Sequence, residues 1–196
     1  MSVLAAAIKN GEIAIACDTQ CSFGSLIVDS RNLHNHNKLY VIKESVIGVI
    51  GWSAVAGAME HLMASKSELI DFTSRQAIYS TFLKIHPILR DEYFIEADED
   101  DEQPAESSQV SALIINRNGI FEVGRFREVN QFNKYWATGA GRKLALGAMY
   151  ATYNAATSAS DVVKAGVLAA AEFDESCSGP AIIETLKHRH SAGSAS

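Results

Sequence analysis

The pattern of apolar and polar positions in the first quarter of the chain predicts two β-hairpins. Residues 3–8 and 12–17 are apolar runs of strand length, and the Asn10-Gly11 pair between them favours the positive φ angles of a tight turn. After a polar stretch, the segment KLYVIKESVIGVIG at 38–51 predicts two further strands around a turn at Lys43-Glu44. We therefore expect four strands before residue 52.

From Ser53 onward the apolar spacing changes to that of helices. Thr73 and Gln76 have the spacing of a capping box, so a second helix is expected to start there. Pro87 is expected to kink or end this helix, because proline lacks the backbone N–H that a helix needs. The expected inner faces comprise Val55, Met59, Leu62, Met63 and Leu69 in the first helix and Ile78, Phe82, Ile85 and Leu89 in the second.

The second half of the chain repeats the order of strands followed by helices. Its expected elements are a hairpin over 110–123 that turns at Asn118-Gly119, a strand over 132–137, a helix after the TGAG turn at 138–141, a helix from Ser158 with Asp161 as its capping-box partner, and a strand over 181–184. The last helix has one apolar face, made of Val162, Val163, Gly166, Val167 and Ala170. Grouped strands and paired helices favour an α+β sandwich, with helix layers on two packed sheets, over alternating βαβ units.

Length and composition predict a single globular domain over residues 1–196, with 47% hydrophobic and 20% charged residues. A net charge of -6 argues against a nucleic-acid or anionic-membrane partner held by a basic surface. The opening apolar run has no basic segment before it, and no run of about 18 apolar residues occurs, so neither secretion nor membrane insertion is indicated. Three cysteines suit a reducing compartment, and we expect a cytoplasmic protein.

Two segments are strongly polar. Residues 91–106 carry nine carboxylates and no cation, which is typical of a solvated loop, expected here over 96–106. The alternative is an acidic lining for a cavity or a docking surface. Residues 187–196 are expected to form a polar C-terminal tail.

Neither a nucleotide site nor a metal site is predicted, and no cofactor is expected. In TGAGRKL, Leu144 stands where the third glycine of a dinucleotide-binding motif belongs, so a tight strand-to-helix turn is favoured. The pairs His34/His36 and His188/His190 have no cysteine or carboxylate at a known ligand spacing. Cys17 is expected to be a small buried hydrophobic residue.

Ser2 has the potential to be both nucleophile and base. A serine hydroxyl becomes a good nucleophile only when a base removes its proton, and an N-terminal residue carries such a base in its own α-amine. The unperturbed pKa of this amine, about 7.7 to 8.0, lies near neutral pH. Removal of the initiator methionine before a small residue would expose the amine of Ser2. The alternative is that serine is simply common at this position.

The segment SVLAAAIKNGEIAIACDTQCSFG resembles the start of proteasome β-type subunits and of the bacterial HslV peptidase. There, a nucleophilic threonine begins a strand and an aspartate lies 16 positions on, which is the spacing of Ser2 and Asp18. Lys38 in NKLYVIKESVIGVIG matches the family's catalytic lysine, after a short insertion in NLHNHN. The bacterial proteasome homologue BPH is the more similar branch, because HslV begins with Thr-Thr and lacks an acidic insert like residues 96–106.

Three further segments extend the resemblance over nearly the whole chain. VIGVIGWSAVAGAMEHL is similar to the strand, loop and helix that carry the oxyanion-hole glycine, here at Gly51 and Trp52. WATGAGRKLALGAMYA resembles the family's G-S-G turn and the helix after it. AAAEFDESCSGP resembles the segment with a supporting aspartate and serine, which fall on Asp174 and Ser178, with Glu175 as the alternative to Asp174.

The resemblance implies the four-layer αββα fold of N-terminal-nucleophile hydrolases and self-assembly into stacked homo-oligomeric rings. It implies hydrolysis of peptides or unfolded proteins within the rings, with an ATPase unfoldase as a possible partner. The catalytic set would be Ser2, Asp18, Lys38, Asp174 and Ser178, with backbone N–H groups at Gly51 and Trp52 for the oxyanion, and Ile50 and Ala54 as apolar neighbours of the substrate.

Three departures from the family pattern predict a slow peptidase. Serine replaces threonine at residue 2, so the methyl group that restricts χ1 is missing. Trp52 stands at the oxyanion-hole glycine position, and Ala140 replaces the serine of G-S-G. Two alternatives follow, an inactive structural ring subunit or an N-terminal-nucleophile amidase that acts on a small molecule.

Overall fold

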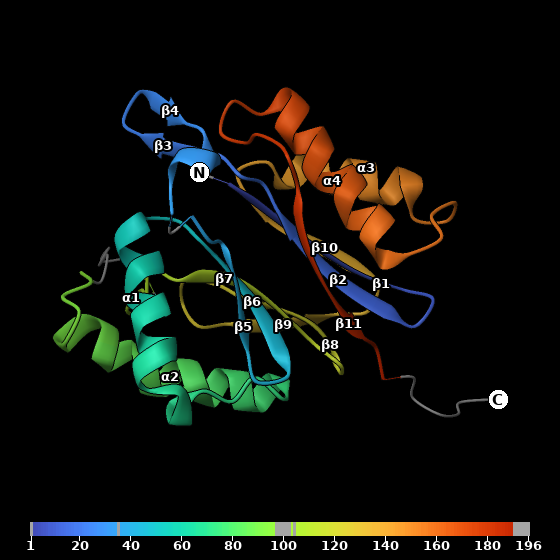
Figure 1. Ribbon diagram of the computed structural model, residues 1–196. Coiled ribbons are helices and arrows are strands. Elements are labelled where there is room, and N and C mark those ends of the chain that lie inside the picture. The colour runs from blue at the N-terminus through green and yellow to red at the C-terminus, as the bar shows by residue number, and fades with distance from the viewer. Residues whose placement is uncertain (1, 35, 97–102, 104, 190–196) are drawn as a thin grey trace.

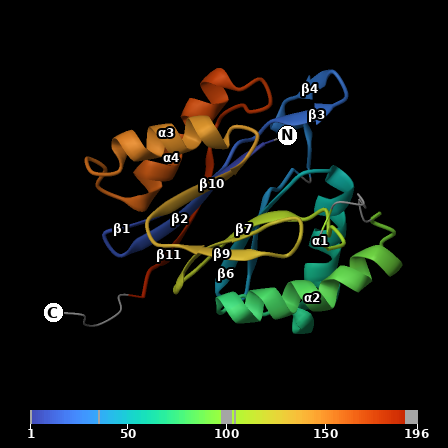
Figure 2. The same ribbon diagram turned by 180° about the vertical axis from the view of Figure 1, so that it is seen from behind.

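Two antiparallel sheets lie face to face, and each carries a pair of helices on its outer side (Figures 1 and 2). The structure is a computed structural model, and it describes residues 2–34, 36–96, 103 and 105–189. Most of the predicted acidic loop, residues 97–102 and 104, and most of the predicted tail, residues 190–196, lie outside the described residues.

Most strands pair with the strand before or after them in the sequence. The two exceptions, both in the four-stranded sheet, join the first two strands of the chain to the last two. The four-stranded sheet has the order β10 (Tyr135–Gly139), β1 (Val3–Lys9), β2 (Glu12–Cys17) and β11 (Ile182–Lys187). The five-stranded sheet has the order β5 (Leu39–Ile42), β6 (Ser45–Ile50), β7 (Ser111–Asn116), β8 (Gly119–Val123) and β9 (Val129–Phe132). Strands β3 (Cys21–Phe23) and β4 (Leu26–Val28) form a separate hairpin.

The helices form the two outer layers. They are α1 (Ser53–Ser65) and α2 (Arg75–Asp91) on the five-stranded sheet, and α3 (Arg142–Thr152) and α4 (Ala159–Phe173) on the four-stranded sheet. This arrangement confirms the expected α+β, four-layer αββα fold. The apolar faces predicted for α2 and α4 are buried as expected, and so are Val55, Met59, Leu62 and Met63 of α1.

Three apolar cores hold the layers together. One lies between the sheets and joins Leu4, Ala6 and Ile15 of the four-stranded sheet to Val46 and Leu113 of the other. The other two fill the spaces between each sheet and its helices. Because strands β1 and β2 face apolar layers on both sides, all their central residues are apolar, and a simple alternation of apolar and polar residues is absent.

Local turn and cap signals explain where several elements begin. Asn10 and Gly11 have φ angles of 48° and 78°, which confirms the tight turn expected between β1 and β2. Ser158 and Asp161 form the expected capping box at the start of α4. At α2 the prediction was wrong by one residue, since the N-cap is Ser74, whose hydroxyl accepts a hydrogen bond from the N–H of Ala77.

Helix α2 does not end at Pro87, and helix α1 does not reach Leu69. Helix α2 continues past Pro87 to Asp91, because Ile85 and Leu89 on either side of the proline are buried in the core. Their burial outweighs the one backbone hydrogen bond that proline removes. Leu69 lies in a short 3₁₀ turn beyond the end of α1 and is only partly buried.

The single strand expected over 132–137 is two strands in different sheets. Phe132 ends β9 opposite Ile120, and Tyr135 begins β10 opposite Ala7. The polar pair Asn133-Lys134 makes the crossing, and the carbonyl of Lys134 accepts the N–H of Ile8 at 2.7 Å. Stacking of Phe132 on Trp136, with ring centroids 4.3 Å apart, packs the two sides of the crossing together.

The expected polar tail and the expected solvated loop each include a residue that is held by the fold. The last strand extends to Lys187, the first residue of the expected tail, because β11 pairs along the whole of β2. Glu106, at the end of the expected solvated loop, binds Arg90 and His86 of α2 at 3.0 Å. This anchoring role of Glu106 was not predicted, because its partners lie 20 and 16 positions away in the sequence.

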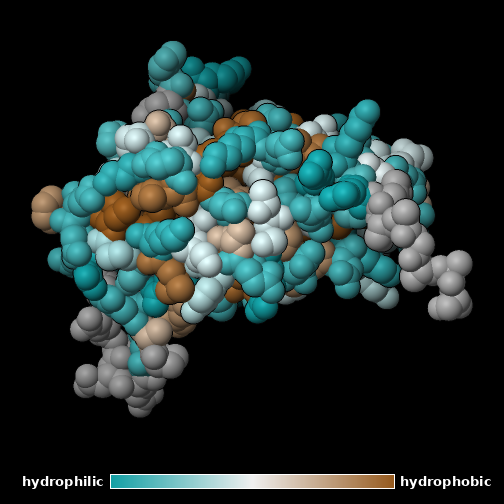
Figure 3. Space-filling view, turned by 90° about the horizontal axis from the view of Figure 1, so that it is seen from below, coloured by the Kyte–Doolittle hydropathy of each residue, from teal (hydrophilic) through white to brown (hydrophobic). Residues whose placement is uncertain are grey.

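No helix among the described residues is both long and apolar enough to cross a membrane. The face of the molecule shown in Figure 3 carries apolar patches set between hydrophilic side chains.

Candidate active site

The first hairpin brings Ser2 and Asp18 to the same end of the four-stranded sheet. In the register of β1 and β2, Leu4 lies opposite Cys17. The next residues outward, Val3 and Asp18, therefore lie opposite each other at the end of the hairpin, and Ser2 precedes Val3. The N–H of Asp18 donates to the carbonyl of Val3 at 3.3 Å, and the N–H of Val3 donates to Oδ1 of Asp18 at 3.0 Å. The Asp18 carboxylate is thus fixed against the residue that follows Ser2.

Asp18 and Lys38 form a buried ion pair at this end of the sheet. Lys38 Nζ lies 2.8 Å from Asp18 Oδ1, the carboxylate is fully buried, and the lysine side chain is 11% exposed. Lys38 reaches the site from the residue before β5, where its carbonyl accepts the N–H of Val49 at 3.0 Å. The structure therefore brings together two residues that lie 20 positions apart, as the resemblance implied.

The second oxygen of Asp18 holds two more backbone groups. Oδ2 accepts the N–H of Gln20 at 3.0 Å and that of Ser178 at 3.5 Å. Ser178 is also held to the segment after β2, because its carbonyl accepts the N–H of Thr19 at 2.9 Å. Four donors from separate segments converge on one carboxylate, so Asp18 organises the site as well as pairing with Lys38.

Ser2 is 8% exposed and lies against the turn that precedes α3. Its carbonyl accepts the N–H of Ala140 at 2.8 Å. Gly139 has a φ of 100°, and a Cβ there would overlap the carbonyl oxygen of Ser2 and stand 2.9 Å from Cδ1 of Ile50. Glycine is therefore required for the close approach of these three segments.

The predicted oxyanion region follows Ile50 at the end of β6. Gly51 has a φ of 123°, and Trp52 is the N-cap of α1. Trp52 is 75% exposed, and Ala54 is exposed as well. Backbone N–H groups in the first turn of a helix lack partners within the helix and carry partial positive charge, which favours an anion near this position.

Asp174 stands at the C-terminal cap of α4, at the start of the loop that carries Ser178. Its carboxylate accepts the N–H of Ser176 at 2.9 Å, and its carbonyl accepts that of Cys177 at 3.0 Å. These bonds shape the loop that delivers Ser178 to Asp18. Glu175, the alternative to Asp174, is exposed and offers its backbone carbonyl to Nε2 of Gln20 at 2.9 Å.

Gln20 was not predicted as a site residue. Its N–H binds Asp18 and its side chain binds the 175–178 loop, so it links two parts of the site. A lone glutamine two residues after an aspartate gives no sequence signal for this role.

Two buried thiols near the ion pair are not nucleophiles at neutral pH. Burial raises the pKa of Cys17 to about 12, although the nearby charge of Lys38 acts to lower it. Burial also raises the pKa of Cys177 to about 12. Within the part of the chain that the structure describes, no three histidine, cysteine or acidic side chains gather as metal ligands.

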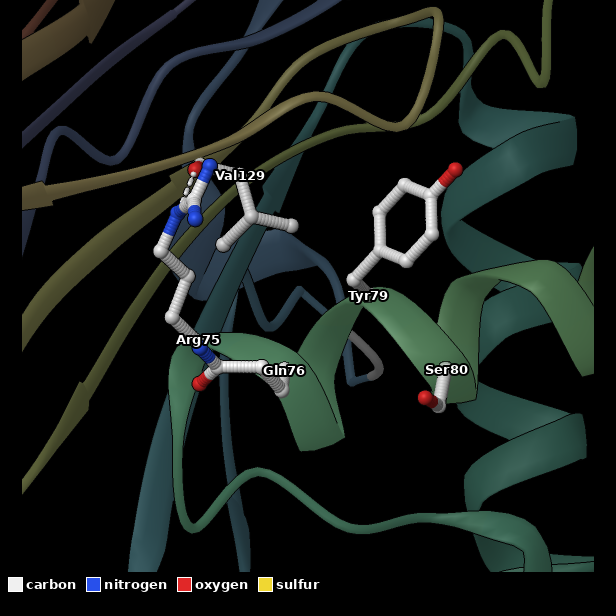
Figure 4. Close-up of a pocket in the computed structure, with 5 residues that line it drawn as sticks. All are labelled: Arg75, Gln76, Tyr79, Ser80 and Val129. Carbon is white, nitrogen blue, oxygen red and sulfur yellow. Dashed lines mark hydrogen bonds between the residues drawn. The ribbon is translucent and has the colours of Figure 1, made fainter.

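A pocket of about 370 Å³ lies elsewhere, between the start of α2 and β9 (Figure 4). It is lined by Arg75, Gln76, Tyr79, Ser80 and Val129, and Arg75 Nε donates to the carbonyl of Val129 at 2.7 Å. None of the predicted site residues lines it, and α2 is separated from β1 by the five-stranded sheet.

Comparisons with known proteins place this geometry in a family. No protein-family model and no curated protein matches the chain. Among solved structures, Thiobacillus denitrificans BPH is 31% identical, with a TM-score of 0.89 over 96% of this chain and 99% of that one. The same protein in complex with epoxomicin is 30% identical, with a TM-score of 0.84 over 95% and 99%. Eukaryotic HslV from Trypanosoma brucei, 17% identical over 95% and 99%, has a TM-score of 0.72 and shares the fold. At this identity and coverage, the chain belongs to the family of the bacterial proteasome homologue BPH.

Proposed function

We propose that the protein is an N-terminal-nucleophile endopeptidase that uses Ser2 as its nucleophile and hydrolyses peptide bonds inside a homo-oligomeric ring. The observation that carries the proposal is the buried Asp18–Lys38 pair beside the start of β1. A buried ion pair is a weak source of stability, because the desolvation of both charges offsets their attraction. A role of the Lys38 charge in catalysis would explain why a buried ion pair is present beside the start of β1.

In the proposed reaction, removal of Met1 exposes the α-amine of Ser2. The Oγ of Ser2 attacks the substrate carbonyl carbon while the amine takes the hydroxyl proton, directly or through water. The amine returns this proton to the leaving nitrogen as the C–N bond breaks, which leaves an ester on Ser2. Water then hydrolyses the ester, with the amine again acting as base, and the free serine is restored.

Lys38 would keep the amine in its neutral, basic form. A positive charge nearby disfavours protonation of an amine and so lowers its pKa. Asp18 holds Lys38 in place at 2.8 Å and fixes the backbone of Val3 at 3.0 Å, which sets the position of Ser2 relative to the lysine. Ser178, whose N–H lies 3.5 Å from Asp18, and Asp174, at the start of its loop, would hold the amine and its water.

Backbone N–H groups near Gly51 and Trp52 would stabilise the oxyanion. Removal of one such donor costs about 3 to 4 kcal/mol in a serine protease. The donor is a backbone group, so the tryptophan side chain does not remove it. Ile50 and Ala54 on either side of this region would favour an apolar residue before the scissile bond.

Assembly into rings would confine the reaction. Support comes from membership of the BPH family and from large apolar side chains exposed on the outer helix layer. Tyr150 of α3 is 77% exposed, and Phe173 and Leu168 of α4 are 75% and 42% exposed. A second copy that covered this face would remove these side chains from water. Unfolded proteins in the cytoplasm, delivered with or without an ATPase, are the expected substrates.

The second candidate is an inactive structural ring subunit. One observation favours it: Ala140, which binds the carbonyl of Ser2 through its N–H, has no hydroxyl to take part in proton transfer around the amine. Both candidates predict rings, so only chemistry separates them.

The test compares hydrolysis of fluorogenic peptides by four proteins at equal concentration. Ser2→Ala should assemble as the wild type does but lose hydrolysis, and the matched control Ser80→Ala, on the exposed face of α2, should keep it. Ser2→Thr should be at least as fast as wild type, because its methyl group restricts χ1. Equal activity of Ser2→Ala and wild type would rule out Ser2 as nucleophile, and inactivity of all four would favour the structural subunit.

A further inference from the structure

A thiol and an imidazole meet close to the Asp18–Lys38 pair. Sγ of Cys21 lies 2.7 Å from Nδ1 of His36 and 3.8 Å from Nε2. Cys21 opens strand β3, three residues after Asp18, and His36 lies two residues before Lys38. The two chain segments that carry the ion pair are therefore also joined by a cysteine–histidine contact.

The contact has the arrangement of a nucleophile and its base. Burial raises the pKa of the Cys21 thiol above its ordinary value of 9.0, so the sulfur carries a proton at neutral pH. Burial and the charge of Lys38 lower the pKa of His36, so its ring is neutral and has one nitrogen able to accept a proton. The S–H group of Cys21 can then donate to Nδ1 of His36, and the same nitrogen can take the proton when the sulfur reacts.

Accessibility separates Cys21 from the other two cysteines of the chain. Cys17 is 1% exposed and Cys177 is 4% exposed, both inside apolar cores. Cys21 and His36 are only partly buried, and the hairpin of β3 and β4 stands out from the two packed sheets (Figure 1). A reagent in solution can therefore reach one of the three thiols, and it is the one beside a base.

We propose that Cys21 and His36 form a thiol-modification site that reacts with small-molecule disulfides. The Cys21 sulfur attacks one sulfur of the disulfide R–S–S–R while its proton passes to Nδ1 of His36. The disulfide S–S bond breaks, a bond between Cys21 and S–R forms, and the leaving R–S⁻ takes the proton from His36 as R–SH. The products are a mixed disulfide on Cys21 and one free thiol, and no other oxidant is consumed.

Modification would act on the peptidase through the segments that flank the ion pair, and this consequence rests on the proposed function. The mixed disulfide ends the contact of Cys21 with His36, which lies two residues from Lys38. It also adds bulk next to Gln20, whose N–H binds Asp18 at 3.0 Å. We expect modified protein to hydrolyse peptides more slowly, and a reducing agent to restore the rate.

The first experiment measures reaction with the aromatic disulfide dithiobis(nitrobenzoic acid), whose released thiol absorbs visible light. Native protein should release one equivalent rapidly, and the remaining two of its three cysteines should react only in denaturant. Cys21→Ser should lose the rapid phase, while the matched control Cys177→Ser should keep it. His36→Gln should slow the rapid phase about tenfold or more, because it removes the base.

Peptide mapping of the labelled wild-type protein identifies the modified residue without any variant, so the test does not depend on how well a variant folds. A label on Cys17 or Cys177, or none, overturns the proposal. An unchanged rate in a folded His36→Gln protein, checked by circular dichroism, overturns the role of the base.

The second experiment measures peptide hydrolysis before and after modification, and again after dithiothreitol. Wild type should lose most of its activity and recover it, whereas Cys21→Ser should be insensitive throughout. Full activity of a modified wild-type protein overturns the link to the peptidase. If unmodified wild type hydrolyses no peptide, the proposed function fails, while the labelling result still decides whether Cys21 is a modification site.

Discussion

Replacement of Asp18 by asparagine tests the energetic centre of the site. The carboxylate is fully buried and accepts from Lys38 Nζ at 2.8 Å, from Val3 at 3.0 Å, from Gln20 at 3.0 Å and from Ser178 at 3.5 Å. Asparagine has nearly the same shape but no charge, and its NH₂ group must face at least one of these donors. The change leaves the Lys38 cation, 11% exposed, without its counter-charge.

The expected loss in the free energy of unfolding follows from this geometry. Removal of one partner from a buried ion pair costs about 3 to 5 kcal/mol. For a chain of this size, each kcal/mol lowers the melting temperature by about 2 to 4 °C, so Asp18→Asn should melt about 10 °C lower than wild type. The exposed pair of Lys66 with Glu92, whose side chain is 55% exposed, gives the matched control. Glu92→Gln should cost less than about 1 kcal/mol.

Urea unfolding at one fixed protein concentration measures these differences, because association would make the midpoint depend on concentration. The double variant Asp18→Asn/Lys38→Met should regain at least half of the stability lost by Asp18→Asn, since no buried charge is left unpaired. A cost of less than about 1 kcal/mol for Asp18→Asn, or a double variant no more stable than the single one, would show that the ion pair does not carry this stability.

Three further changes test other parts of the structure. Ser158→Ala removes the capping box of α4 and should lower the free energy of unfolding by about 1 kcal/mol; an unchanged urea midpoint would contradict this role. Gly139→Ala should destabilise by about 2 kcal/mol or more and slow peptide hydrolysis, because its Cβ would overlap the carbonyl of Ser2, whereas Gly57→Ala, in open space within α1, should stabilise by about 0.5 to 1 kcal/mol in the same assay. Burial raises the pKa of Cys17 in the folded state from 9.0 to about 12, so the folded protein keeps a proton that the unfolded chain releases, and the resulting stability is present below pH 9.0 and lost as pH rises toward 12. Melting temperatures measured above about pH 8 should therefore fall more steeply for wild type than for Cys17→Ala, and equal slopes would contradict the shift.

Local signals in the sequence were sufficient for most of the fold. The Asn10-Gly11 turn and the Ser158 capping box depend on residues within four positions of each other, and both are present in the structure. The crossing at Asn133-Lys134 could not be predicted in this way, because the two strands it joins belong to different sheets and their partners are distant in the sequence. The β3–β4 hairpin was not predicted, because its strands are only three residues long and pair only with each other, outside the two large sheets.

The site was predicted by resemblance more than by local pattern. The spacing of Ser2 and Asp18 follows from one hairpin, but nothing local pairs Asp18 with Lys38. The contributions of Gln20 and Gly139 come from contacts between segments more than 100 residues apart, through Glu175 and through the carbonyl of Ser2. Such contacts are fixed only when the sheets pack, and no periodic pattern encodes them.

The central proposal, that Ser2 is the nucleophile and its own base, is tested most directly by intact-mass spectrometry of the protein before and after treatment with epoxomicin. We expect a chain that lacks Met1 and gains one inhibitor per subunit, with the adduct on Ser2 in peptide maps and absent from Ser2→Ala. A chain that retains Met1 and gains no inhibitor would contradict it, because the proposed base would then be blocked.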